Sequence, residues 1–213
     1  MQSRNGLGND YHPSRGTKPR VSRWPMRAWT IQTLDAHEVL QDGRTWRARG
    51  SRVPSQWRDA YVWMTRQMHS RLGPPARQGQ APIWAWREWR GRSRARPDLR
   101  ARGHLPPGTD GVRLELEVEE DRLLPSDFEL WHYVLNGWYL PASHGDERSF
   151  EALATDAARD EVRGRIEASW QRIFDIARID RRYTAPPAER SIQCVLWEIR
   201  PRDVRRVTEF TAR

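Results

Sequence analysis

Residues 112–118 alternate strictly between apolar and charged side chains, and this run constrains the fold more than any other segment. Successive side chains of a strand point to opposite faces, so the alternation predicts a β-strand with one buried face and one face in water. A second run, residues 191–200, is apolar on both faces, which is typical of a central strand. The chain therefore has to build a sheet that other elements cover.

The remaining segments predict further strands and a set of helices. Apolar residues recur at helical spacing along each predicted helix, and a capping box formed by Ser126 and Glu129 marks the start of the third. We therefore predict an α+β fold, with a mixed or antiparallel sheet of about five strands and three or four packed helices. The further strands are expected over residues 28–32, 81–89 and 204–210, and the helices over residues 34–40, 55–72, 126–136 and 147–179.

The tryptophans of the chain allow a sizeable core although apolar residues are scarce. Hydrophobic residues make up 37% of the 213 residues, but twelve of them are tryptophan, and each tryptophan can bury roughly 150–250 Å². We expect a single α+β domain over residues 26–213. Residues 1–25 are polar and show no periodicity, so we expect a disordered N-terminal extension there, with Met26 as an alternative to Met1 as the start of translation.

Several classes of protein are excluded by what the sequence lacks. It has no stretch of 18 apolar residues and no apolar signal-peptide core, which predicts a cytoplasmic protein that does not contact membranes. The single cysteine, Cys194, excludes internal disulfides, and the six dispersed histidines do not have the spacing of metal ligands. We expect no metal site. Because phosphate loops and known catalytic motifs are also absent, the motifs do not decide whether the chain is an enzyme.

Positive charge is concentrated in one part of the chain. The 37 basic residues exceed the 28 acidic ones, which gives a formal net charge of +9. Most of the excess lies in the first half, where the loop over residues 87–102 is rich in arginine. Such a loop suits an anionic partner such as nucleic acid, and a solvated loop that binds nothing is the alternative.

The segment over residues 124–136 carries the first candidate site. On a helix that starts after Ser126, His132 shares an inward stripe with Phe128 and Trp131. A buried imidazole needs a hydrogen-bond partner, which is either a neighbouring carbonyl or a ligand. Asp127 lies in the first turn as either a helix cap or the group that orients His132. His132 and Asp127 are therefore the catalytic candidates.

The segment over residues 82–90 carries the second candidate site. Trp84 and Trp86 lie two residues apart on one strand face, where they would either stack on a base or a nicotinamide-like ring or simply fill the core. Arg87 would hold a phosphate, and Gln32 at the end of the first strand would point into the same cleft. The ligand-binding candidates are Trp29, Gln32, Trp84, Trp86, Arg87, Trp131 and Asn136.

These segments, in this order, resemble a bacterial family of domains of unknown function, number 3841. The likeness covers residues 26–200 and implies no established reaction. The basic insertion at residues 92–96 departs from the family pattern. The segments that carry the likeness are Trp-Thr-Ile-Gln at 29–32, Pro-Ile-Trp-Ala-Trp at 82–86, Pro-Asp-Leu-Arg at 97–100 and Ser-Asp-Phe with Trp-His-Tyr-Val-Leu-Asn over 126–136.

A fainter likeness concerns the opening strand, the short helix after it and the later alternating strand. Their order is similar to small ADP-ribosyltransferase-like domains, and this likeness implies NAD as the ligand. The sequence departs from that pattern, because the first strand lacks a clear nucleotide-gripping Arg or His and the last strand lacks a Gln-x-Glu pair. Glu198 is the candidate for the late-strand glutamate.

Three functions follow as hypotheses. The first is a pocket between the Trp84 and Trp86 strand and the His132 helix that binds a small anionic, aromatic, nucleotide-like ligand, with NAD as the candidate cofactor. The second is a nucleic-acid-binding module that uses the arginine-rich loop over residues 87–102. The third is a structural or partner-binding domain without a site. The sequence leaves the oligomeric state undecided.

Overall fold

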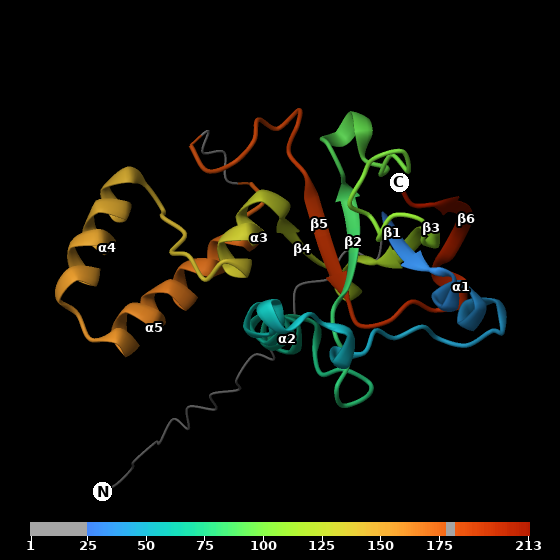
Figure 1. Ribbon diagram of the computed structural model, residues 1–213, viewed down its shortest axis with the longest axis horizontal. Helices are drawn as coiled ribbons and strands as arrows, with labels where there is room; N and C mark the ends of the chain where they lie inside the picture. Colours follow the sequence, from blue (N-terminus) through green and yellow to red (C-terminus); the bar gives the residue numbers. More distant parts are fainter. Residues whose placement is uncertain (1–24, 178–181) are drawn as a thin grey trace, which may run out of the picture.

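The computed structural model describes residues 25–177 and 182–213. Six strands form one antiparallel sheet in the order β4-β5-β2-β1-β3-β6 (Figure 1). The predicted α+β class and antiparallel sheet are thus confirmed, with one strand more than expected. The expected extension over residues 1–25 lies, apart from Pro25, outside the described residues.

The strands are β1 (Pro25–Thr33), β2 (Ile83–Glu88), β3 (Asp110–Glu119), β4 (Leu124–Asp127), β5 (Ile192–Leu196) and β6 (Val204–Thr211). The helices are α1 (Leu34–Gln41), α2 (Arg58–Leu72), α3 (Phe128–Leu135), α4 (His144–Asp156) and α5 (Arg159–Ser169). Short 3-10 turns are η1 (Gly50–Arg52), η2 (Ser55–Trp57), η3 (Arg92–Arg94), η4 (Glu120–Arg122), η5 (Trp170–Phe174) and η6 (Pro201–Asp203).

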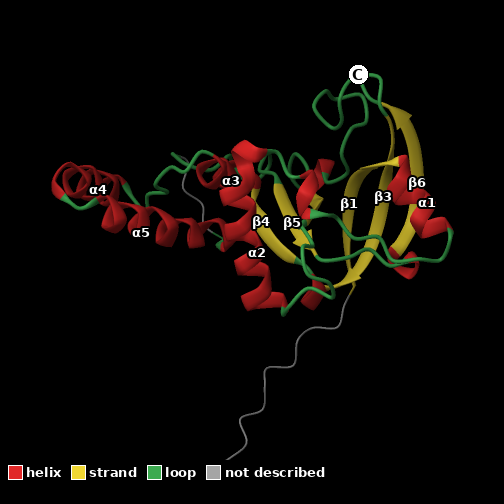
Figure 2. Ribbon diagram, turned by 60° about the horizontal axis from the view of Figure 1, so that its bottom comes forward, coloured by secondary structure: helices red, strands yellow, loops and turns green. Residues whose placement is uncertain are grey.

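The alternating strand β3 organises one half of the sheet. Its apolar residues are fully buried, as the alternation predicts. It pairs along its length with β1 on one side and β6 on the other. The other half consists of β4, β5 and β2, and the two halves are joined at β1 and β2, where the register pairs Trp29 with Trp86. In Figure 2, β4 and β5 lie on one side of β1, and β3 and β6 lie on the other. The sheet therefore consists of two groups of three strands, which meet where Trp29 of β1 lies opposite Trp86 of β2.

Each face of the sheet carries its own core. On one face, α2, α3 and η5 cover β4, β5 and β2, and large aromatic rings fill the space between them. Trp63, for example, lies edge-on to Trp170 at 5.5 Å between ring centroids and stacks on Phe174 at 5.8 Å. On the other face, α1 and the loop after it cover the apolar residues of β3, β1 and β5. The tryptophans therefore supply much of the first core, which explains how so few apolar residues suffice.

The prediction of one continuous helix over residues 147–179 is wrong, and its last two residues lie outside the described ones. The chain leaves helical geometry at Ala157 and Ala158, both of which have extended backbone angles, so α4 and α5 form a hairpin and η5 follows. The hairpin projects away from the sheet in both views (Figures 1 and 2). The apolar residues of α4 and those of η5 have different partners. Phe150 stacks on Tyr139 at 3.8 Å, whereas Trp170 and Ile173 are buried in the first core.

The start of α3 lies one residue later than expected. Asp127 is the N-cap, and its Oδ1 accepts a hydrogen bond from the Leu130 backbone nitrogen at 3.0 Å. Ser126, the expected cap, belongs to β4 and lies opposite Gln193. A residue used in strand pairing has its side chain fixed by the sheet, and the next polar residue takes the cap.

Within residues 25–177 and 182–213, the helices are all too short or too polar to cross a lipid bilayer.

Candidate functional site

A cavity of about 980 Å³ opens where β2 ends and where α3 and β5 begin. Two loops complete its wall: the arginine-rich loop after β2 and the segment that leads into β5, both near the top of Figure 1. The wall is formed by Trp86, Trp89, Arg90, Ser93, Arg94, Ala101, Arg102, Gly103, His104, Phe128, Glu129, Ala185, Ala188, Glu189 and Ser191. Aromatic and basic side chains therefore meet in one concave surface.

Aromatic rings form two parts of this wall. Trp86 from β2 and Phe128 from α3 lie 4.8 Å apart between ring centroids, tilted by 58°. Trp89 and His104, from the two ends of the arginine-rich loop, lie 5.9 Å apart. Rings held in this way present flat apolar faces on which a planar ligand can stack.

Arginines form the basic part of the wall. Arg90, Arg94 and Arg102 lie in it together with the carboxylates of Glu129 and Glu189. The Arg90 guanidinium lies over the Trp89 ring at 4.6 Å, a cation–π geometry. In the described part of the chain, these three arginines form no ion pair with a carboxylate. Their guanidinium groups are therefore available to a bound anion.

His104 is the imidazole that lines this cavity. Its Nε2 lies 2.9 Å from the Asp98 carbonyl oxygen, and a carbonyl oxygen can only accept a hydrogen bond, so Nε2 carries the proton. The neutral ring then keeps Nδ1 as an acceptor. The hydrogen bond to Asp98 therefore fixes which ring nitrogen of His104 carries the proton.

Gly91 holds the two loops of the cavity together. Its backbone nitrogen donates to the Arg190 carbonyl oxygen at 2.9 Å, and its φ is +78°. A Cβ at this position would lie 2.0 Å from the Ala188 carbonyl oxygen. Ser191 adds a second link, because its Oγ donates to the Trp89 carbonyl oxygen. The positions of Arg90 and Arg94 therefore depend on a close approach that only glycine permits.

Asp127 stabilises the segments that form the cavity wall. Its side chain is fully buried and forms an ion pair with Arg190, whose side chain is 6% exposed. Arg190 also donates from Nη1 to the Ile176 carbonyl oxygen at 2.7 Å. The Phe128 backbone nitrogen donates to the Ser191 carbonyl oxygen at 3.0 Å. Together these bonds fix the first residue of α3 against the start of β5.

A row of polar side chains lies directly beside the cavity wall. Across the sheet, Ser126 is opposite Gln193, Gln193 is opposite Trp86, and Trp86 is opposite Trp29. Residues opposed in this way share one face of the sheet. Ser126 Oγ, Gln193 Nε2 and Trp29 Nε1 are buried, and no hydrogen-bond partner for them exists among the described residues. Unpaired buried polar atoms are costly, so each of them calls for an explanation, such as strain, an ordered water or a ligand.

The structure places His132 differently from the sequence-based expectation. The buried stripe of α3 consists of Leu130, Trp131 and Val134, and His132 is exposed. The sequence of this helix allows either of two apolar stripes to face the core. With the observed stripe buried, the His132 imidazole stays in water, which avoids the cost of desolvating it. His132 Nδ1 is 3.0 Å from the Phe128 carbonyl oxygen, and the two rings are 4.8 Å apart. His132 therefore lies beside the cavity wall rather than in it.

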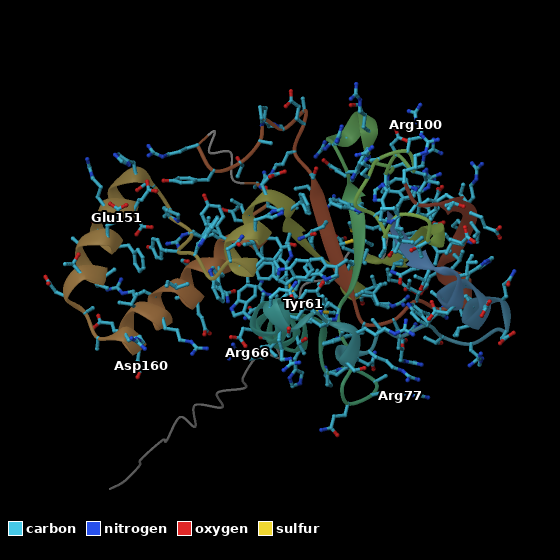
Figure 3. The ribbon with its side chains drawn as sticks, viewed as in Figure 1. Tyr61, Arg66, Arg77, Arg100, Glu151 and Asp160 are labelled. Carbon is cyan, nitrogen blue, oxygen red and sulfur yellow. The ribbon has the colours of Figure 1, made fainter. Side chains whose placement is uncertain are left out.

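Trp84 and Trp131 lie in the first core. Their ring centroids are 4.8 Å apart, and Tyr61 on α2 meets both of them edge-on (Figure 3). Trp29 is buried at the junction of the two halves of the sheet. These three tryptophans therefore do not reach the cavity, in contrast to Trp86.

The polar ligand-binding candidates also lie elsewhere. Gln32 donates to the Thr30 hydroxyl at 2.8 Å. Arg87 lines a separate cavity of about 470 Å³ beside residues 187–192. Asn136 donates to the His132 carbonyl oxygen at 2.7 Å and lines a groove between α2 and α5. Of the proposed site residues, the structure therefore brings Trp86 into the main cavity and leaves the others outside it.

Reasoning from the sequence misses most of the cavity residues as members of one site. It assigns Arg90, Arg94 and Arg102 to a rival hypothesis, nucleic-acid binding, and gives His104 and Phe128 no role of their own. The signal that could have found them is the arginine-rich loop itself, which begins immediately after the Trp84 and Trp86 strand. The two hypotheses therefore describe neighbouring parts of one cavity.

Two further features bear on the chemistry of the chain. The Cys194 side chain is completely buried in β5, and this burial raises the pKa of its thiol to about 12, so it is unreactive near neutral pH. No cluster of three or more His, Cys, Asp or Glu side chains suited to a metal ion occurs in the described ranges.

The fold and the cavity define an α+β protein in which an antiparallel sheet of two three-stranded halves carries an aromatic, arginine-lined cavity at one end. A family model described as a domain of unknown function, DUF3841, matches residues 27–205. The chain belongs to this family, as the resemblance in its sequence indicated. Neither a curated protein nor a solved structure matches the chain.

Proposed function

We propose that the cavity binds a small anionic, aromatic ligand of the nucleotide class. The observation that carries the proposal is the meeting of Trp86 and Phe128 with Arg90, Arg94 and Arg102 in one concave wall. A nucleotide needs both kinds of surface: a flat apolar face for its base and guanidinium forks for its phosphates. The volume of about 980 Å³ is that of a ligand site.

The polar row beside the wall supports an orientation for this ligand. A ring that lies on Trp86 would turn one edge toward Gln193, which is the residue opposite Trp86. Gln193 Nε2 and the Ser126 hydroxyl are both able to donate, so they suit carbonyl oxygens or ring nitrogens of the ligand. The phosphates would then face the arginine-rich loop. We infer a base or a carboxamide-bearing ring, and NAD combines both.

If the ligand undergoes a reaction, the structure supports His104 as the acid or base, because it lines the cavity with a fixed tautomer. His132 remains a candidate at the rim through its contact with Phe128. Asp127 supports Phe128 and Arg190 and does not reach the cavity.

The first prediction concerns binding itself. We expect ATP or NAD, at about one hundred times its dissociation constant, to raise the Tm of the full chain by about 5 °C. Trp86→Leu removes the stacking surface and should abolish this shift. Trp138→Leu is the matched control, because Trp138 is 57% exposed and lies outside the cavity. Differential scanning fluorimetry measures all three proteins. Equal shifts in the two variants would contradict the proposal.

The second prediction uses the unpaired amide of Gln193. Gln193→Met replaces an unsatisfied polar group by an apolar one of similar size, so we expect the free energy of unfolding to rise by up to about 1 kcal/mol. Nucleotide affinity should fall in the same variant. A substitution that raises stability but weakens binding is typical at a residue that is retained for function.

Gln80→Met is the matched control for this experiment. Gln80 is equally buried, but its Nε2 donates to the Trp197 carbonyl oxygen at 3.0 Å, and its Oε1 accepts from the Arg77 backbone nitrogen at 2.6 Å. Here the same substitution should destabilise by about 1–3 kcal/mol, because it breaks satisfied bonds. Urea denaturation gives both values. A loss of stability in Gln193→Met as large as in the control would show that Gln193 has a structural partner.

Nucleic-acid binding is the second candidate function. It is favoured by the unpaired arginines of the loop and by Trp89, which holds a guanidinium over its ring. A twelve-nucleotide oligothymidylate should then bind with an affinity that falls steeply as salt rises, because each neutralised phosphate releases counterions. Binding of this oligonucleotide without any response to ATP or NAD would favour this function over the first.

A further inference from the structure

We propose that a second cavity, which the arginine-rich loop also lines, is a separate site for a phosphate group. This cavity has a volume of about 1000 Å³. Five arginines line it, Arg90, Arg94, Arg96, Arg100 and Arg113, and Asp98 is the one carboxylate in its wall. Figure 3 labels Arg100 on the loop between β2 and β3 that forms much of this wall. The site does not require the aromatic cavity to be occupied, so it goes beyond the nucleotide proposal.

Arg113 is the central residue of this site. It belongs to β3 and is 9% exposed, although its guanidinium is charged. Nη1 donates to the Pro97 carbonyl oxygen at 2.7 Å, and Nη2 to the Thr208 hydroxyl at 3.5 Å. Both partners are neutral, and across the described residues Arg113 forms no ion pair with a carboxylate. A buried guanidinium without a counter-charge is costly and calls for an anion.

Charged neighbours of Arg113 add to the excess of positive charge around its guanidinium. Burial first, and then the positive charges of Arg96 and Arg206, lower the pKa of the Arg113 guanidinium. The negative charges of Glu115 and Asp98 oppose this effect only from outside ion-pair distance. The electrostatic environment of this buried cation is therefore dominated by cations.

Asp98, the carboxylate in the cavity wall, does not compensate for the positive charge of the arginines. Asp98 accepts hydrogen bonds from Arg100 Nε at 3.0 Å and from Arg100 Nη2 at 2.8 Å. These bonds hold the pKa of the Asp98 carboxyl well below its usual range. Asp98 is thus paired with Arg100, and among the described residues the other arginines of the cavity form no ion pair with this carboxylate.

A phosphate group fits this arrangement better than a carboxylate does. It offers several oxygens and up to two negative charges, and planar guanidinium forks bind such oxygens in pairs. Inorganic phosphate, the phosphates of a small ester and the backbone of a nucleic acid all share this chemistry. The two cavities share Arg90 and Arg94 in their walls, so a phosphate here would also order the loop that borders the aromatic cavity.

The experiment uses the full chain with sodium pyrophosphate as the probe, at constant ionic strength set with sodium chloride. We expect pyrophosphate to raise the Tm by several degrees beyond the chloride control, and titration calorimetry to show one saturable site. Arg96→Gln should weaken the apparent Kd at least about tenfold, since it removes one charge-assisted bond. Arg92→Gln is the matched control, because Arg92 lies on the same loop but outside this cavity, 3.4 Å from Glu88.

Further variants and probes separate the outcomes. Trp86→Leu should keep the pyrophosphate response, so failure of the nucleotide proposal leaves this one standing. Competition between pyrophosphate and an oligothymidylate would identify a nucleic-acid backbone as the source of the phosphate, and pyrophosphate binding alone would identify a small phosphate compound. No response beyond chloride, or equal losses in Arg96→Gln and Arg92→Gln, would overturn the site and leave only a diffuse positive surface.

Discussion

Asp127→Asn is expected to lower the free energy of unfolding by about 3–5 kcal/mol, because it removes the buried carboxylate that pairs with Arg190. Asp127 is fully buried, and its Oδ2 accepts from Arg190 Nε. Asparagine can still accept the cap bond from the Leu130 backbone nitrogen. The substitution therefore isolates the ion pair from the helix cap. Urea denaturation at neutral pH measures the loss.

The control for this prediction is the double variant Asp127→Asn with Arg190→Met. The double variant removes both charges of this pair, so it should be more stable than Asp127→Asn alone, in which the buried cation has lost the Asp127 carboxylate. Such a recovery would show that the cost comes from the pair and not from the new amide. If Asp127→Asn stays within about 1 kcal/mol of the wild type, the pair does not hold the cavity together.

Gly91→Ala is expected to lower the free energy of unfolding by at least about 2 kcal/mol. Two causes add: the left-handed φ of +78°, and a Cβ placed 2.0 Å from the Ala188 carbonyl oxygen. The clash is with backbone on both sides, so neither side can move without shifting the wall of the cavity. Ligand-induced stabilisation should disappear together with stability, since Arg90 precedes this residue and the Arg94 backbone nitrogen donates to its carbonyl oxygen.

Gly108→Ala separates the two causes. Gly108 has a φ of +79°, almost the same as Gly91, but no atom lies within 4 Å of the position that a Cβ would take there. Its substitution should therefore cost only the conformational term, about 1 kcal/mol, and leave ligand binding unchanged. Equal destabilisation of the two variants would show that the close approach between the loops is unimportant.

Much of the fold could be predicted because local patterns carry it. The alternation in β3 and the two apolar faces of β5 are properties of single segments. Strand β3 contains the whole predicted run, whereas β5 covers only Ile192–Leu196 of the strand expected over residues 191–200. The strand β4 was missed for a physical reason. It has four residues, includes Pro125 and lies at the edge of the sheet, where a missing backbone donor is tolerated, so no periodicity marks it.

Other features depend on contacts between distant segments. No Gly or Pro marks the break at Ala157 and Ala158, and alanine itself favours helix. The local sequence therefore gives no sign of the break. It exists because Trp170 and Ile173 must reach the core while Phe150 stacks on Tyr139. A local pattern cannot encode such a division, so the sequence alone suggested one long helix.

The cavity could be predicted only in pieces. Its wall joins residues near 90, 128 and 190, and the pairing of Trp86 with Gln193 and of Gln193 with Ser126 brings these segments together. Sequence reasoning found the Trp86 strand and the arginine-rich loop as separate features. It placed its acid–base candidate at His132, whereas the imidazole in the wall is His104. Sheet register, which no single segment reveals, decides which of these side chains meet.

Photo-crosslinking tests the central claim most directly, because it reports both binding and place. The full chain is irradiated with 8-azido-ATP, with and without excess ATP, and the labelled peptides are identified by mass spectrometry. We predict saturable labelling of peptides that contain Trp86, His104 or Phe128, which excess ATP suppresses and Gly91→Ala removes. Labelling that is spread over the basic surface and unaffected by ATP, or confined to peptides outside the cavity, would contradict the account.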